Sequence, residues 1–307
     1  MSITLEERYL GCFLGLACGD AVGTTVEFSP RGSFSPVQDM VGGGPFGLKP
    51  GQWTDDTAMA ICLVQSMLHC DAFNPVDQMN RYVNWWRWGY PSPTGECFDI
   101  GMTVQSALSR YLVNGDPMAG SADPRSAGNG SMMRLAPVVL HYFGEPTAVI
   151  HYARESSRTT HAALEALDCC EVLALVLMRA LQGVDLEAGL LALPCRSDLC
   201  GSVRQLAEQS YLTKCADQIH GSGYCVESLE AALWCIATTT SFKEAVLKAA
   251  NLGDDADTTA AIAGQIAGAL YGVQDIPQHW IDQLYMVEDL SAMARGLLQQ
   301  ATTSSGS

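Results

Sequence analysis

The stretch Asn251-Leu-Gly-Asp-Asp-Ala-Asp-Thr-Thr259 leads into a run of small residues, 260–272, that we predict to be a buried helix. It places three aspartates and two threonines within six positions, directly after a glycine turn. An aspartate at a helix start often caps free N–H groups, which would account for one or two of these acids. Three carboxylates repel one another and lose hydration when buried, which indicates a bound cation. Asp and Thr oxygens are hard ligands that suit Mg²⁺ or Mn²⁺.

A second stretch, Gly51-Gln-Trp-Thr-Asp-Asp-Thr57, repeats this chemistry much earlier in the chain. Hydroxyl and carboxylate side chains again follow a glycine and precede an apolar run, here a helix predicted over 55–70. If the two helix starts meet in the fold, their five aspartates converge. A pair of divalent ions about 3.5–4 Å apart would neutralise them. The sequence therefore favours a binuclear metal site over simple capping.

The composition limits the classes of partner. The chain has 307 residues, 48% of them hydrophobic and only 16% charged, so it can bury a large core. Its net charge of −16 argues against a nucleic-acid or membrane surface as the main partner. We find no signal peptide and no apolar run both long enough and free of charge to span a bilayer. Many of the twelve cysteines lie in apolar helical runs, which is typical of reduced thiols, so we expect a cytoplasmic protein.

Helical periodicity dominates the chain, and no segment shows convincing β-alternation. We therefore predict one all-α domain over 1–302, followed by a disordered tail at 303–307. A capping box of Thr4 and Glu7 begins the first helix. Ser157 to His161 is expected to open a long helix that ends at Leu181. Further helices are expected at 75–88, 100–113, 198–212, 226–239, 241–251 and 277–300.

Three loops carry candidate binding groups. In Ser126-Ala-Gly-Asn-Gly-Ser-Met-Met-Arg134 the glycines allow close approach of a ligand, and Asn129 and Ser131 offer hydrogen bonds to an anion at a helix start. An ordinary Asn-Gly turn with a Ser cap fits the spacing equally well. His161 would be either a ligand contact or a capping residue in the first helical turn, where the dipole disfavours its protonation. Glu27 lies in the loop after the first helix, where a lone acid is usually solvated.

Five motifs, taken in order, resemble those of the ADP-ribosylglycohydrolases. The resemblance runs from about residue 8 to residue 272 and is closest to the bacterial dinitrogenase reductase-activating glycohydrolase branch. The motifs are Gly19-Asp20-Ala21-Val-Gly23 with Glu27, Trp53-Thr-Asp-Asp-Thr57, Gly128-Asn-Gly-Ser-Met132, Thr160-His161 and Gly253-Asp-Asp-Ala-Asp-Thr258. Each motif alone is weak, and the five in sequence are specific.

The resemblance implies a compact orthogonal helical bundle with a binuclear Mg²⁺ or Mn²⁺ cleft. The residues that match the family's metal ligands are Thr54, Asp55, Asp56, Asp255, Asp257 and Thr258. Those that match its substrate-binding residues are Gly128, Asn129, Gly130, Ser131, Met132 and His161. Those that match its catalytic acids are Glu27, Asp56 and Asp99. Ala256 replaces a family threonine that is not expected to coordinate, and Asp254 is an additional acid with no matching role.

The resemblance also implies a reaction, the hydrolysis of the N-glycosidic bond between ADP-ribose and a modified protein side chain, most often arginine. Glu27 or Asp56 would take the proton of the attacking water, and Asp99 would hold the guanidinium leaving group. Three alternatives stay open at this point. They are another ADP-ribosyl linkage (serine, nucleobase or O-acetyl-ADP-ribose), cleavage of a phosphoester or pyrophosphate, and an immunity or binding protein that acts against an ADP-ribosylating toxin.

Overall fold

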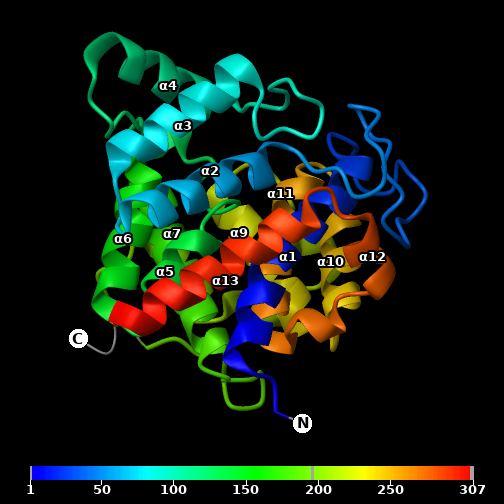
Figure 1. Ribbon diagram of the computed structural model, residues 1–307. Coiled ribbons are helices and arrows are strands. Elements are labelled where there is room, and N and C mark those ends of the chain that lie inside the picture. Colours follow the sequence, from blue (N-terminus) through cyan, green and yellow to red (C-terminus); the bar gives the residue numbers. More distant parts are fainter. Residues whose placement is uncertain (1, 195–196, 305–307) are drawn as a thin grey trace.

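A computed structural model describes residues 2–194 and 197–304 of the chain, and this part is all helical, as predicted (Figure 1). The α-helices of the described residues are α1 Leu5–Gly23, α2 Asp55–Cys70, α3 Pro75–Trp88, α4 Met102–Asn114, α5 Ala136–His141, α6 Pro146–Arg158, α7 Leu164–Leu181, α8 Gly201–Ala207, α9 Cys225–Ala237, α10 Phe242–Ala250, α11 Ala256–Tyr271, α12 Gln278–Gln283 and α13 Val287–Ser304. Short 3₁₀ turns lie at Thr24–Val26, Pro124–Ser126, Ser210–Thr213, Ala216–Gln218 and Val273–Asp275. Only isolated β-bridges occur among these residues.

Helices α1 and α11 form a central pair whose backbones touch. A Cβ atom placed on Gly15 would lie 2.3 Å from the carbonyl oxygen of Gly264, and one on Gly19 would lie 2.1 Å from that of Ala260. These distances are far below van der Waals contact, so only glycine fits on this face of α1. The four-residue spacing of Gly11, Gly15, Gly19 and Gly23 keeps the two axes close over about three helical turns. The pairing places the end of α1 beside the start of α11.

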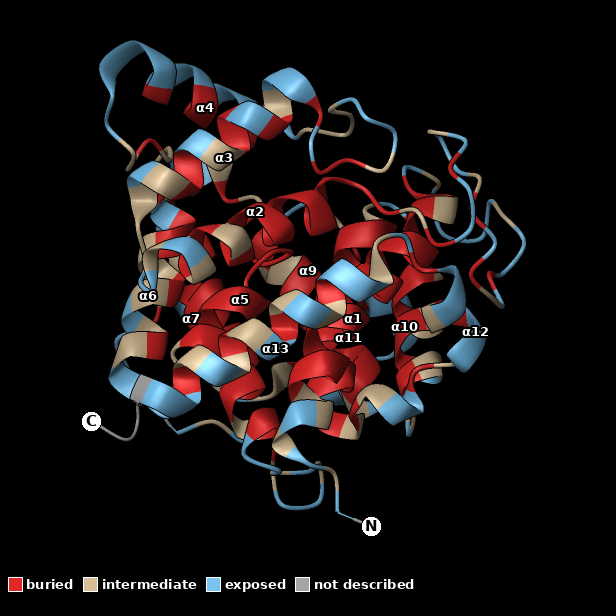
Figure 2. Ribbon diagram, in the orientation of Figure 1, coloured by how far each residue is buried: buried red, intermediate tan, exposed pale blue. Residues whose placement is uncertain are grey.

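The remaining helices enclose this pair (Figure 2). Helices α7, α9 and α10 pack against α11, and α13 packs against α1. Helices α3 and α4 lie together at one side of the molecule, beyond α2 (Figure 1). Within the described residues one segment, Leu5–Val26, has the length and apolar composition of a membrane span. An 18-residue apolar stretch of this segment is 94% buried inside the protein. Its hydrophobicity is therefore explained by its place in the core.

One detail at a helix start follows the sequence closely. The capping box predicted for Thr4 and Glu7 is confirmed, because each side chain accepts a hydrogen bond from the other residue's backbone N–H. In the tryptophan-rich α3, Trp85 is buried in the core, whereas Trp88 is 76% exposed. The cysteines of the described part are free, and Cys195 lies outside it.

The helix expected to open at Ser157 is wrong. Ser157 belongs instead to the last turn of α6, and α7 begins only at Leu164. The intervening loop is fixed by hydrogen bonds from His161 N to Ser157 O and from Ala162 N to Ser121 O. His161 therefore precedes a helix rather than occupying its first turn, and the helix dipole does not explain its properties.

The single helix expected over 277–300 is also wrong, because it divides into α12 and α13. Tyr285 donates its backbone N–H to the carbonyl of Gly51, and Met286 has a φ of 58°, a left-handed conformation that a continuous helix excludes. Helix α13 then continues to Ser304 and so includes two positions of the predicted tail. The rest of that tail, 305–307, lies outside the described residues.

Candidate metal centre and cleft

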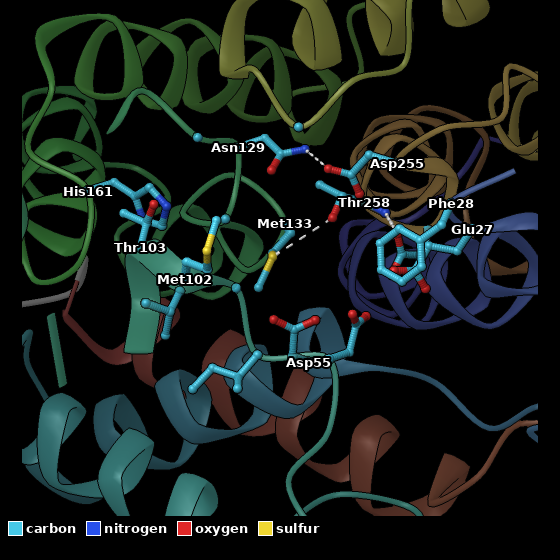
Figure 3. Close-up of a pocket in the computed structure, with 18 residues that line it drawn as sticks. Glu27, Phe28, Asp55, Met102, Thr103, Asn129, Met133, His161, Asp255 and Thr258 are labelled. Carbon is cyan, nitrogen blue, oxygen red and sulfur yellow. Dashed lines mark hydrogen bonds between the residues drawn. The ribbon is translucent and has the colours of Figure 1, made fainter. Parts of the chain in front are cut away.

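A deep cleft lies where the starts of α2 and α11 meet the loops that follow α1 and precede α4 and α5 (Figure 3). It has a volume of about 640 Å³, within the range of small-molecule sites. Of the residues predicted to act, the following line it: Glu27, Asp55, Asp99, Gly128, Asn129, Gly130, His161, Asp255, Asp257 and Thr258. Thr54 and Asp56 lie buried directly behind its acidic wall.

The predicted meeting of the two acidic stretches is confirmed by hydrogen bonds between them. The Thr54 hydroxyl donates to Asp257 Oδ2 at 3.1 Å. The Thr258 hydroxyl donates to Asp56 Oδ1 at 3.2 Å. Each helix start thus supplies a hydroxyl donor to a carboxylate of the other, so the two stretches form one polar cluster inside an apolar fold.

Asp257 belongs to two groups of three carboxylates. Oxygens of Asp55, Asp56 and Asp257 lie within 4.8 Å of one another, and so do oxygens of Glu27, Asp99 and Asp257. Asp56 Oδ2 is buried and has no hydrogen-bond partner. A carboxylate oxygen left unpaired among other acids is costly unless a cation or a proton accompanies it. These residues therefore fit a metal site, and the sharing of Asp257 fits two neighbouring ions.

Burial and mutual repulsion raise the pKa of every acid in this cluster. Burial, followed by the charges of neighbouring carboxylates, raises the pKa of Asp55, Asp56 and Asp257 well above the usual value. Burial and the charges of Asp99 and Asp255 raise the pKa of Glu27 to about 9. Burial raises the pKa of Asp99 to about 7. Without a cation, the cluster consequently holds protons at neutral pH.

Glu27 and Asp99 are both placed for chemistry. Glu27 is only 4% exposed, so the expectation that a lone loop acid is solvated is wrong for this position. The end of α1 carries Glu27 towards the start of α11, where it forms a group with Asp99 and Asp257. Asp99 adopts a φ of 59° in the loop before α4, which turns this non-glycine residue through the left-handed region.

Asp20 supports the cluster and was not predicted as a site residue. It is fully buried in α1, and the backbone N–H and the hydroxyl of both Thr54 and Thr57 lie within hydrogen-bond distance of its carboxylate. The single hydrogen of the Thr54 hydroxyl is shared between Asp20 and Asp257. These bonds fix the first turn of α2. Its position in the Gly19-Asp20-Ala21 motif was the available sign, but its partners lie 34 and 37 residues later, at the start of α2.

Asp254, the additional acid, does not join the cluster through its side chain. The side chain is exposed, and the residue has a φ of 56°. Its backbone pairs with the loop after α1, because Phe28 N donates to Asp254 O and Asp254 N donates to Ser29 O. Main-chain atoms of Asp254 thus join the loop before α11 to the loop that follows Glu27.

The opposite wall of the cleft is built by the loop 127–130 and His161. Asn129 Nδ2 donates to Asp255 Oδ2 at 2.8 Å, which connects this loop to the acidic cluster. The loop is held by backbone hydrogen bonds to the segment 223–225. It does not open directly into a helix, since α5 begins only at Ala136. The ligand-facing groups of this wall are therefore backbone atoms, the Asn129 amide and the His161 ring.

Two residues of the predicted binding loop point away from the cleft. Ser131 is buried, accepts a hydrogen bond from Ser157 Oγ at 2.8 Å and contacts Cys170 Sγ. Met132 is fully buried, and its carbonyl accepts a hydrogen bond from Gln265. Their geometry supports the loop rather than forming the cleft wall. Other residues line the cleft but were not predicted to do so. They are Phe28, Ile100, Gly101, Met102, Thr103, Val104, Met133 and Gly223.

Known proteins share this architecture. A family model described as ADP-ribosylglycohydrolase matches residues 1–306. The ADP-ribosylarginine hydrolase Tri1 of Pseudomonas putida (strain GB-1) is 44% identical over 96% of this chain and 79% of its own length. The ADP-ribosyl-[dinitrogen reductase] glycohydrolase of Rhodospirillum rubrum is 32% identical over 92% of each chain. A solved structure titled "ADP-ribosylglycohydrolase-related protein complex" superposes with a TM-score of 0.87 at 44% identity, covering 97% of this chain and 99% of the other.

Proposed function

Because this chain belongs to the ADP-ribosylglycohydrolase family, we propose that it hydrolyses the N-glycosidic bond between ADP-ribose and the arginine side chain of a modified protein. The observation that carries this proposal is the shared position of Asp257 between two acidic groups, one of which contains Glu27 and Asp99 at the cleft. The names of the relatives from Pseudomonas putida and Rhodospirillum rubrum, both hydrolases of ADP-ribosyl linkages, support the same reaction.

We propose two Mg²⁺ or Mn²⁺ ions as the cofactor. The residues that would hold them are Thr54, Asp55, Asp56, Asp255, Asp257 and Thr258, which offer oxygen ligands only. When bound, such ions bind substrate hydroxyls and lower the pKa of water. The unpaired Asp56 Oδ2 and the raised pKa values of the cluster support this role, since both describe acids that lack a positive partner.

Glu27 is the group best placed to move a proton. Its carboxylate borders the cleft beside Asp257, and its pKa of about 9 in the cation-free cluster shows how strongly its ionised form depends on positive charge nearby. Cations in the cluster would favour the ionised form, in which Glu27 can accept a proton from the attacking water. Glu27 would therefore act as a general base only when cations occupy the cluster.

Asp99 would hold the leaving group. Its carboxylate lies beside Glu27 at the cleft, which suits charge-assisted hydrogen bonds to a guanidinium. The loop 128–130, with Asn129 and His161, would hold the ADP-ribose on the other side. The bond to be cleaved would thus lie between an acid for the leaving group and a wall of backbone amides and one imidazole.

The test is a panel of ADP-ribosylated substrates, linked through arginine, serine or a nucleobase, each assayed with Mg²⁺, with Mn²⁺ and with EDTA. We expect intact ADP-ribose to be released from the arginine linkage with metal and not with EDTA. AMP and ribose 5-phosphate as products would indicate pyrophosphate cleavage and would overturn the proposal. Release from serine alone would overturn the arginine assignment.

A further inference from the structure

Arg134 is a buried cation with no carboxylate partner in the part of the chain that the structure describes. Its side chain is fully buried, and its hydrogen-bond acceptors among the described residues are neutral. One terminal nitrogen donates to the Gly130 carbonyl at 2.6 Å, the guanidinium lies 4.8 Å above the ring of Tyr82, and Nε has no partner. Burying a charged group costs free energy unless ion pairs or hydrogen bonds offset the loss of hydration. The burial of Arg134 therefore indicates a function for the two groups to which it donates, the Gly130 carbonyl and the Thr160 hydroxyl.

The second terminal nitrogen of Arg134 leads to the cleft through one hydroxyl. It donates to Thr160 Oγ1 at 2.7 Å, and Thr160 Oγ1 lies 2.8 Å from Nδ1 of His161. Arginine can only donate, so Thr160 accepts from it, and the single hydroxyl hydrogen stays available for donation. Nδ1 is the acceptor in reach of that hydrogen. If Nδ1–H donated to Thr160 instead, a buried hydroxyl hydrogen would have no acceptor among the described residues, an arrangement that folded proteins avoid.

The hydrogen on His161 then belongs on Nε2, the ring nitrogen that lies against the glycine loop of the cleft. A Cβ atom placed on Gly128 would lie 3.3 Å from Nε2, and one on Gly130 would lie 3.0 Å from Cε1, so the ring lies directly against the glycine loop. His161 lines the cleft in this position (Figure 3). Burial, followed by the charge of Arg134, lowers the pKa of His161 to about 3, which keeps the ring neutral. A neutral ring carries one hydrogen, so the choice of tautomer decides what it offers a ligand.

We propose that Arg134, acting through the Thr160 hydroxyl, is a positioning residue that holds His161 in the Nε2–H tautomer and so presents a hydrogen-bond donor to an acceptor oxygen of the bound ligand. The same guanidinium holds the Gly130 carbonyl, which keeps the loop and the imidazole in one arrangement. The inference deepens the proposed function, in which that ligand is ADP-ribose with its phosphate and ribose oxygens. The tautomer itself is a property of the ligand-free protein and can be tested separately.

The experiment compares the wild type with Thr160→Val, which keeps the β-branched shape and removes the hydroxyl. With ¹⁵N-labelled histidine, long-range ¹H–¹⁵N spectra of the ligand-free protein report which ring nitrogen carries the hydrogen. Only six histidines are present, and the loss of one signal set in His161→Asn assigns the ring. We expect Nε2–H in the wild type and a mixture of tautomers in Thr160→Val. Calorimetry should show ADP-ribose binding weakened about 10-fold, the value of one hydrogen bond.

Two further variants keep the test decisive. Thr159→Val makes the same chemical change one residue earlier, where the hydroxyl donates to Ser156 O, and it should leave the His161 spectrum and ADP-ribose affinity unchanged. Thr160→Ser restores a hydroxyl and should return the Nε2–H signal. Nδ1–H in the wild type, or an unchanged tautomer in Thr160→Val, would overturn the inference. Absence of hydrolysis together with the expected tautomer shift would overturn the proposed function and support the positioning role.

Discussion

The two walls of the cleft bury ionisable groups of opposite sign that have no ionic partner among the described residues. The acidic wall, formed by the starts of α2 and α11, buries carboxylates that take part in none of the ion pairs found among the described residues. The glycine-loop wall, formed by residues 127–134 with Thr160 and His161, buries Arg134, which also lacks an ionic partner.

Elsewhere the chain pairs such groups, as Arg154 does with Asp168 and Glu171. No ion pair among the described residues joins Arg134 to the acids on the other side of the cleft. Each wall therefore suits a binding partner that is not part of the chain. A cation suits the acidic wall, and an acceptor oxygen suits the other. The predictions below test whether the two walls are separate in this sense.

The largest effect is expected for Asp257→Asn on the acidic wall. Asp257 belongs to both carboxylate groups, so its charge acts on the whole cluster. Metal chemistry contributes several kcal/mol to such reactions, and a loss of about 4 kcal/mol corresponds to roughly 1000-fold in rate. We expect hydrolysis of ADP-ribosylarginine to fall by at least that factor.

Thermal unfolding supplies the companion measurement for Asp257→Asn. A metal present at about 100 times its dissociation constant stabilises a folded protein by about 2.7 kcal/mol, and this gain should disappear in the variant. Thr160→Val on the other wall should keep the full gain. Lost activity with unchanged stabilisation by Mg²⁺ or Mn²⁺ would remove Asp257 from the metal ligands and would break the comparison.

A smaller effect, of opposite sign on the two walls, is expected from pH in the metal-free protein. The pKa of Glu27 rises from 4.5 to about 9 on folding, and that of Asp99 rises from 3.8 to about 7. The folded state therefore binds more protons, and the stability these acids contribute is lost as pH rises through the folded values. His161, whose pKa falls from 6.5 to about 3, contributes stability that is lost only as pH falls below 6.5.

Unfolding temperatures measured in EDTA from about pH 7 to about pH 9 isolate the acidic wall when the wild type is compared with Glu27→Gln. His161 is neutral there in both states, and the buried cysteines, whose pKa values are raised by burial, contribute equally to both proteins. We expect the unfolding temperature to fall across this range. Adding Mg²⁺ should flatten the curve, and Glu27→Gln should reduce the slope without metal. A metal-free protein that becomes more stable over this range would show that its acids are already paired, which would contradict the comparison.

The acidic wall was predictable because its pattern is local. Thr54 to Thr57 and Asp255 to Thr259 each begin an apolar helix, and a cluster of acids before such a helix indicates a polar site without knowledge of the fold. That the two meet required the resemblance or the structure. The four-residue spacing of glycines in α1 permits close helix packing, but it does not identify α11 as the partner.

The glycine-loop wall was less predictable because its chemistry depends on contacts between distant residues. Arg134 obtains its role from Thr160, which follows it by 26 residues and two helices. Ser131 turns inward because it contacts Ser157 and Cys170. Asp20 illustrates the same limit on the acidic side, since four donors from a later helix give it its function. A spacing rule describes neighbours along the chain and does not identify such partners.

The smallest effect is expected for Asp254→Asn, which limits the extent of the acidic wall. Asp254 lies next to Asp255, yet its side chain is exposed and its main-chain atoms make the contacts with Phe28 and Ser29. Asparagine tolerates the φ of 56° as well as aspartate does, and an exposed substitution of this kind changes stability by about 0.5 kcal/mol or less. We therefore expect metal-dependent stabilisation and the rate of hydrolysis to stay within about 2-fold of the wild type, the factor that corresponds to this energy. This variant is also the matched control for Asp257→Asn, since both remove one carboxylate from the same short stretch. A loss of metal affinity in Asp254→Asn comparable to that in Asp257→Asn would extend the metal site to the exposed edge of the cluster, and burial would no longer separate the acids that bind a cation from those that do not.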